Sequence, residues 1–172
     1  MSRMSSRFHQ IAWLVVAVGV LAAAAVLLPQ APLHAVATDS NPNCLIATGP
    51  LDAAVEAIYV LDTLTGDLKA AVVSKRQPGF QAQFARNILA DFTLEQGKKP
   101  SFLMVTGIAD IARAPGGIRP STSLVYVAEV NTGIMCAYVI PWSPEAHAAD
   151  KPVTAALIPW GMWKFRTAAV RE

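Results

Sequence analysis

The chain is poor in the residues that metal binding and catalysis use most. Among its 172 residues are two cysteines and three histidines, and His147 is the single histidine after residue 34. The sequence has no Cys-x-x-Cys or His-x-x-x-His pair for a metal and no Gly-x-Ser-x-Gly hydrolase motif. It also lacks a phosphate loop that ends in Lys-Ser/Thr. We therefore expect no metal, no cofactor and no catalytic residues.

An excess of charge is also missing beyond the N-terminus. The chain has 14 Lys plus Arg and 12 Asp plus Glu, and residues 1–37 contain Arg3 and Arg7 but no acidic residue. Residues 38–172 therefore carry 14 − 2 = 12 basic against 12 acidic residues. Nucleic acids select basic patches, so a nucleic acid is not expected as a partner.

One long apolar segment lies near the N-terminus. Residues 11–28 are 18 consecutive uncharged residues. As a helix they would span about 27 Å, close to the roughly 30 Å of a bilayer core. The basic stub at 1–10 precedes this segment, and no Lys or Arg follows it until Lys69. The positive-inside rule thus predicts a transmembrane signal anchor in the cytoplasmic membrane, with an internal N-terminus and an extracytoplasmic domain.

Cleavage of this segment is the alternative to anchoring. Ala35, Val36 and Ala37 form an A-x-A site, and cleavage there would release a secreted or periplasmic chain that starts at Thr38. Residues 29–50 are rich in Pro and polar residues and are expected to form a tether, followed by a single domain at 51–172. Outside the cytoplasm a disulfide between Cys44 and Cys136 is permitted, and two buried thiols are the alternative.

Two stretches predict β-hairpins with the same kind of turn. Residues 57–73 and 125–140 each contain a β-rich run, a short polar turn that ends in Gly, and a second β-rich run. The turn residues are Asp62, Thr65 and Gly66 in the first hairpin, and Glu129, Thr132 and Gly133 in the second. Six identical pairs lie 67 positions apart, namely Tyr59/Tyr126, Val60/Val127, Thr65/Thr132, Gly66/Gly133, Ala70/Ala137 and Val72/Val139.

The Asp-x-x-Thr-Gly turn resembles the hairpins of β-propeller blades of the quinoprotein type. Blades recur at about 40 to 50 residues, and at least four blades are needed. Two copies 67 residues apart exclude a whole propeller within this chain. The similarity of the hairpins is explained either by duplication or by the general suitability of this turn for a hairpin.

The other segments predict further strands and one helix. Strands are expected near residues 101–111, 153–160 and 163–168, and Ile88, Leu89 and Phe92 have the spacing of a helix over 86–96. Residues 80–84 alternate like a strand but could also belong to that helix. The predicted fold class is α+β, a mainly antiparallel sheet of about five to seven strands with one covering helix.

Aromatic and apolar residues give the remaining functional signals. Trp142, Trp160 and Trp163 stand near the ends of predicted strands, where they would form a ligand or partner patch if exposed, or close the core if buried. The strand at 134–140 is apolar on both faces and must be covered twice. Either the sheet curls on itself, or a homo-oligomer or another protein supplies the second cover.

Three segments are similar to a group of small, signal-anchored bacterial proteins that have no assigned activity. These segments are residues 102–107, 125–130 and 165–171. The resemblance covers most of the expected domain and implies no functional residues. The leading hypothesis is a membrane-tethered extracytoplasmic structural or protein-interaction module without catalysis. The alternative is an extracytoplasmic domain that binds a small ligand or glycan through its Trp-rich C-terminal part.

Overall fold

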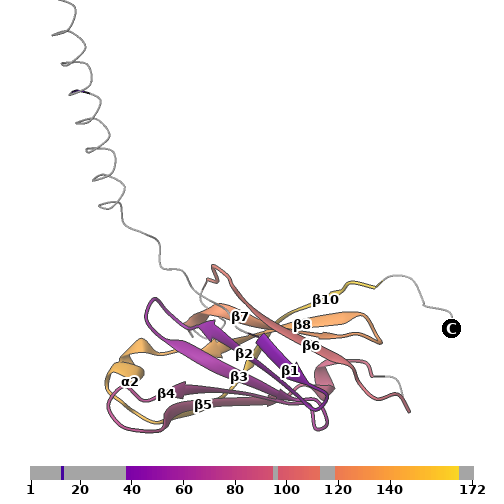
Figure 1. The fold of residues 1–172 in the computed structure, drawn as a ribbon, viewed down its shortest axis with the longest axis horizontal. Helices are drawn as coiled ribbons and strands as arrows, with labels where there is room; N and C mark the ends of the chain where they lie inside the picture. Colours follow the sequence, from indigo (N-terminus) through magenta and orange to yellow (C-terminus); the bar gives the residue numbers. More distant parts are fainter. Residues whose placement is uncertain (1–12, 14–37, 95–96, 113–118, 167–172) are drawn as a thin grey trace, which may run out of the picture. The chain divides into compact units, whose positions relative to one another are not determined.

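The computed structural model describes residues 13, 38–94, 97–112 and 119–166. The strands are β1 (Thr38–Asn41), β2 (Cys44–Pro50), β3 (Glu56–Asp62), β4 (Asp67–Val73), β5 (Phe80–Asn87), β6 (Phe102–Ile108), β7 (Pro120–Glu129), β8 (Ile134–Pro141), β9 (Val153–Ala156) and β10 (Ile158–Lys164). They form a six-stranded sheet in the order β1-β2-β3-β4-β5-β9 and a four-stranded sheet in the order β10-β8-β7-β6. Figure 1 shows the two sheets as separate layers.

The predicted α+β fold class is wrong, because the described domain is almost entirely β-sheet. Its ten strands exceed the expected number. Between residues 38 and 166, the described helical elements are the 3-10 turn η1 (Leu89–Asp91) and the five-residue helix α2 (Pro144–Ala148). Neither is long enough to cover a sheet face, so each sheet instead covers the other.

Over residues 86–94, the end of a strand and the 3-10 turn η1 replace the helix predicted over 86–96, and residues 95–96 lie outside the described residues. β5 continues to Asn87 because its backbone pairs with β4 up to that residue, while β9 pairs with it up to Ala85. The next N–H, that of Ile88, donates to the carbonyl of Gly66 at 2.9 Å. Ile88 and Phe92 are buried, but they reach the core from η1 and its flanks rather than from a helix.

The predicted tether at 29–50 is also wrong for its second half. Residues 38–50 form the hairpin of β1 and β2, whereas residues 29–37 lie outside the described residues. Leu45 and Ala47 alternate into the core and thereby attach β2 to the sheet. Pro42 lies in the turn and Pro50 ends β2, two positions where a missing N–H does not break the ladder.

The structure also bears on the predicted membrane segment. Among the described residues, no helix combines the length and the apolar character needed to cross a membrane. The transmembrane helix and signal anchor predicted at 11–28 therefore gain no support from the described residues, and apart from Trp13 that segment lies outside them.

The core lies between the two sheets. It consists of alternate residues from facing strands, among them Leu45, Tyr59, Leu68 and Phe84 from the larger sheet and Met104, Val127 and Tyr138 from the smaller one. On one side β2 meets β6 and β7, where the Thr122 N–H donates to the Leu51 carbonyl at 3.0 Å. On the other side the fully buried Leu157 connects β9 to β10, so the chain passes directly from one sheet to the other.

Both predicted hairpins are confirmed, and their likeness extends to the flanking strands. β3 pairs with β4, and β7 pairs with β8, around Gly66 and Gly133. Each hairpin is preceded by an antiparallel strand, β2 or β6, and its second strand pairs with a further antiparallel strand, β5 or β10. We call β2–β5 the first repeat and β6, β7, β8 and β10 the second repeat.

The pairing registers of the two repeats coincide. Cys44 lies opposite Asp62, and Phe102 lies opposite Glu129, the equivalent turn acid. This register aligns Leu45 with Leu103, Thr48 with Thr106, and Gly49 with Gly107, three identical pairs. Asp67 pairs with Asn87 just as Ile134 pairs with Lys164. A four-stranded unit, rather than a hairpin alone, is therefore repeated.

Candidate functional site

The most unusual surface of the domain is the side of the four-stranded sheet that faces away from the core, which we call the outer face. Its strand registers place twelve residues in three cross-strand rows. The rows are Leu103-Ala128-Met135-Trp163, Val105-Tyr126-Ala137-Gly161 and Gly107-Leu124-Val139-Ile158. None of the twelve side chains is charged, and the Tyr126 hydroxyl is their single polar group apart from the indole N–H of Trp163.

The outer face is exposed mainly along its two edge strands. Leu103 and Val105 on β6 are 61% and 51% exposed, and Trp163 on β10 is 64% exposed. Between them, Tyr126, Met135 and Ala137 are half-buried, whereas Leu124, Ala128 and Val139 are buried. Charged residues interrupt most protein surfaces, so an uncharged face of this extent is unusual for a surface in contact with water.

Comparison of the repeats explains why this face is apolar. The residues of the first repeat that are equivalent to the outer face point into the core. They include Leu45, Ala47, Tyr59, Leu61, Leu68, Ala70 and Val72, all of them buried. Their counterparts in the second repeat are Leu103, Val105, Tyr126, Ala128, Met135, Ala137 and Val139. The outer face thus has the composition of a core face.

The three tryptophans of the predicted patch do not share one surface. Trp142 is buried, and its Nε1–H donates to Asp52 Oδ2 at 2.8 Å. Trp160 and Trp163 lie on the edge strand β10, where they are 37% and 64% exposed. Trp160 is the extra residue of a β-bulge between Pro159 and Gly161, and the Trp163 ring lies 6.2 Å from that of Phe165.

The predicted turn residues stabilise the two hairpins through backbone hydrogen bonds. The Gly66 N–H donates to the Asp62 carbonyl at 2.9 Å, and the Gly133 N–H donates to the Glu129 carbonyl at 3.0 Å. Asp62 Oδ1 accepts from the N–H groups of Leu64 and Thr65 at 2.8 and 3.2 Å, and these bonds lower the pKa of its carboxyl. Thr65 and its carboxylate partner therefore have a structural role in the turn.

The second turn differs because its carboxylate is buried. Glu129 is 1% exposed, yet both carboxylate oxygens have partners. Oε2 accepts from the Thr132 N–H and hydroxyl at 2.7 and 2.8 Å, and Oε1 accepts from the Ser101 N–H at 2.9 Å. Burial opposes ionisation of Glu129, but these hydrogen bonds outweigh it and lower the pKa of the carboxyl.

The two cysteines are free thiols in different sheets. Cys44 is half-buried in β2, and Cys136 is buried in β8. Burial raises the pKa of the Cys136 thiol. The thiol is therefore protonated at neutral pH and is a poor nucleophile.

A polar cluster that the sequence did not reveal surrounds Asp91. Arg86 forms a bidentate pair with its carboxylate at 2.7 and 2.6 Å, and the Tyr138 hydroxyl donates to Oδ2 at 3.0 Å. The Arg86 guanidinium lowers the pKa of Asp91. Tyr138 comes from the other sheet, so no local spacing could have indicated this cluster. With its carboxylate fully engaged, it joins the sheets rather than offering a reactive group.

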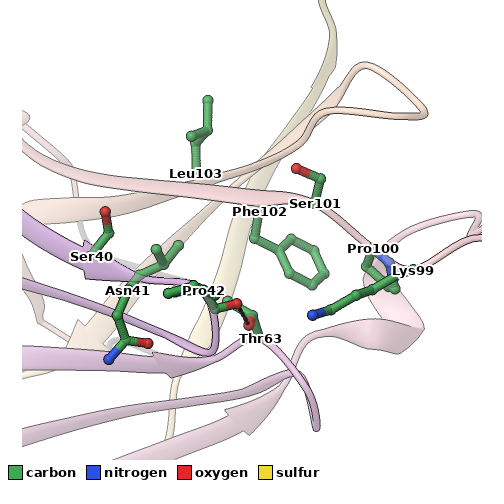
Figure 2. Close-up of a pocket in the computed structure, with 10 residues that line it drawn as sticks. Ser40, Asn41, Pro42, Thr63, Lys99, Pro100, Ser101, Phe102 and Leu103 are labelled. Atoms are coloured by element: carbon green, nitrogen blue, oxygen red, sulfur yellow. Dashed lines mark hydrogen bonds between the residues drawn. The ribbon is translucent and has the colours of Figure 1, made fainter.

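A pocket of about 520 Å³ opens where β1 and β2 diverge from β6. Its lining includes Asn41, Thr63, Lys99, Ser101 and Phe102. Figure 2 shows the Phe102 ring and the Lys99 side chain projecting toward Pro42 in the β1–β2 turn and Thr63 in the β3–β4 turn. Leu103 of the outer face borders this pocket, but its side chain points away from it. The pocket combines one cation, several hydroxyl groups and an aromatic ring.

The His147 side chain in α2 packs inside the domain and contacts two other side chains. Its Nδ1 lies 2.6 Å from Gln81 Oε1, and its ring packs 5.2 Å from that of Trp142. Within the part of the chain that the structure describes, no three His, Cys, Asp or Glu side chains gather as a metal site would require.

In the comparisons with known proteins, no family model, no curated protein and no solved structure matches this chain.

Proposed function

We propose that the protein is a non-catalytic protein-interaction module whose contact surface is the outer face of the four-stranded sheet. The observation that carries this proposal is that no side chain in the three cross-strand rows of that face is charged, although Leu103, Val105 and Trp163 are each more than half exposed. The chemistry of the face requires a partner surface that is itself apolar and has few charges, because a charged group buried against it would remain unpaired.

The size of the face corresponds to a small protein interface. Four strands spaced by about 4.8 Å, each contributing about six residues of 3.4 Å, span roughly 400 Å². At about 25 cal/mol per Å², covering this area would contribute ~10 kcal/mol before the costs of association. A face of this size is about half of one partner's share of a standard interface.

Photo-cross-linking from the outer face tests the proposal. We would replace Leu103 by benzoylphenylalanine and, as a matched control, Leu64, which is 60% exposed in the β3–β4 turn. We expect a protein adduct from position 103, little from position 64, and loss of the position-103 adduct when Val105→Glu places a charge beside it. Equal adducts from both positions would contradict the proposal.

The second candidate function is binding of a small polar ligand or glycan in the pocket beside Phe102. It is supported by the juxtaposition of the Phe102 ring with Lys99 and Ser101, since sugars stack on aromatic rings while hydroxyl and amino groups bind their oxygens. Thermal-shift measurements with a glycan panel test it. A hit that survives Lys99→Ala and Ser101→Ala would not come from this pocket.

A further inference from the structure

We propose that the partner of the outer face is a second copy of this chain, and that copies associate head to tail. In this arrangement the outer face of the second repeat packs on the outward surface of the first repeat of the next copy. The inference rests on the proposed function and specifies its partner. It follows from comparing which faces of the two repeats are already paired within one chain.

The contact inside the chain provides the template. The core-facing side of the first repeat, including Leu45 and Tyr59, packs on the core-facing side of the second repeat, including Met104 and Val127. The outer face is equivalent to the former, because Leu103 and Tyr126 are the counterparts of Leu45 and Tyr59. It therefore requires a surface equivalent to the core-facing side of the second repeat.

That required surface exists on the outward side of the first repeat. Aligning the two repeats by their strand registers gives the following counterparts in the second and first repeats: Met104 and Ile46, Thr106 and Thr48, Val125 and Ile58, Val127 and Val60, and Tyr138 and Ala71. Ile46 is 36% exposed, and Ile58, Val60 and Ala71 are half-buried, so this surface retains apolar groups that another sheet could cover. One copy thus presents both halves of the same contact on opposite sides.

Glycines mark where the sheets approach most closely. A side chain at Gly49 would meet Thr106 Cβ at 3.1 Å and Ser123 Oγ at 3.0 Å across the core. Gly107 is the identical equivalent of Gly49 in the outer face. In the proposed contact it would face Thr48 of the next copy, the counterpart of Thr106. The repeat thus preserves both the glycine and the threonine of the closest approach.

The outer face brings no charge of its own to the contact. The twelve residues of the outer face include no charged side chain. The outward surface of the first repeat carries Glu56 at one end of β3, and Asp62, Asp67 and Lys69 toward the turn that joins β3 to β4. In the core Ser123 lies beside Gly49, and the register makes Glu56 the counterpart of Ser123 and Gly107 the counterpart of Gly49. In the proposed contact the Glu56 carboxylate of the next copy would therefore lie beside Gly107, where the Tyr126 side chain packs. A hydroxyl is a suitable donor for that carboxylate.

A head-to-tail contact differs in kind from a symmetric dimer. Each copy uses two different surfaces, so copies add until the rotation closes a ring or the stack continues. Repeats of this kind cannot bury their apolar faces alone and gain stability from neighbours on both sides. Each copy would then cover both the outer face and its complement, about twice the area of a single contact.

Two complementary variants of the full chain test this geometry. Val105→Glu blocks the outer face, and Ile46→Glu blocks the outward surface of the first repeat, at positions that are 51% and 36% exposed. Leu64→Glu, in the β3–β4 turn outside both surfaces, is the matched control. Sedimentation velocity over a range of concentrations would give the mass of each variant, and circular dichroism would confirm that each is folded. If either variant unfolds, Leu103→Glu or Val60→Glu replaces it.

We expect the wild-type chain and Leu64→Glu to form species larger than a monomer. Each blocking variant alone should associate at least about a hundredfold more weakly. An equimolar mixture of the two variants should form a 1:1 heterodimer and nothing larger, because one contact remains possible. The proposal is overturned by a wild-type monomer at all concentrations, by a mixture that stays monomeric, or by a blocking variant that still associates alone. The last outcome would indicate a symmetric contact.

The two proposals fail separately. If the chain is monomeric, but position 103 cross-links to a different protein and Val105→Glu abolishes that adduct, a second copy is excluded as the partner. The proposal of an interaction module then stands. If position 103 gives no more adduct than position 64 and the chain is monomeric, both proposals fall.

Discussion

The two repeats of this domain have the same strand order and register but opposite exposure. Leu45 in the first repeat is 7% exposed, whereas the identical Leu103 in the second is 61% exposed. Tyr59 is buried, and Tyr126 is half-buried on the outside of its sheet. The same pattern of residues thus makes a core in one place and a surface in the other. The comparison teaches that a strand pattern defines two faces but not which of them is inside.

The largest expected effect separates the two equivalent leucines. Leu45→Asp would place a carboxylate in the core and should cost more than about 4 kcal/mol of unfolding free energy. Leu103→Asp should cost less than about 0.5 kcal/mol, because its side chain is mostly solvated. Urea unfolding at low protein concentration measures both. Similar losses from the two substitutions would show that the outer face is covered within one chain.

The next largest loss of unfolding free energy is expected from substitution of the turn glycines. Gly66 and Gly133 have φ of 72° and 68°, and an added Cβ would meet Leu89 Cγ at 2.4 Å or Arg166 Cβ at 2.2 Å. Each Gly→Ala variant should lose about 1–3 kcal/mol. The loss should be larger at Gly133, because the backbone of Arg166 lies only 3.2 Å away and has to move. An equal or smaller loss at Gly133 in urea unfolding would contradict this ranking.

The two turn acids should differ for reasons of burial. Glu129→Gln should cost about 2 kcal/mol, because a neutral amide cannot accept all four hydrogen bonds that reach the buried carboxylate. Asp62→Asn should cost less, since water can replace the bonds of a turn near the surface. Thermal unfolding at neutral pH compares the two variants. Greater destabilisation by Asp62→Asn would refute the assigned roles.

Acid should weaken the domain through its buried carboxylates. Hydrogen bonds that outweigh burial hold the pKa of Glu129 low, and the Arg86 guanidinium does so for Asp91. Both groups therefore stabilise the fold above their unfolded-state pKa of about 4, and this contribution disappears as the pH falls through the lower folded-state pKa. Urea unfolding between about pH 6 and pH 3 should show a shallower decline for Glu129→Gln than for the wild type.

The smallest effect concerns the cysteines. Because Cys44 and Cys136 are free thiols in separate sheets, a reductant should leave the melting temperature unchanged within about 1 °C. Thermal melts with and without dithiothreitol check this. A drop of several degrees would indicate a disulfide and would require the first strands to pair differently.

Local chemistry made some elements predictable. The hairpins followed from a turn acid, a threonine and a glycine with positive φ, all within five residues. The helix expected at 86–96 failed because the backbone partners of Arg86 and Asn87 lie in β4, a remote segment. The tether failed over residues 38–50 because Pro42 and Pro50 occupy a turn and a strand end. The sequence left open whether the tryptophans are exposed or buried, and Trp142 is buried because its indole N–H binds Asp52, far away in sequence.

The sequence by itself determined the two hairpin turns and the apolar alternation of the strands, because these depend on contacts between residues a few positions apart. It also indicated that β8 is apolar on both sides. The tertiary structure alone decided that Leu45 is buried while Leu103 faces outward. The physical reason is that burial of a sheet face depends on what stacks against it, and among the described residues no third sheet stacks on the outer face of the second repeat.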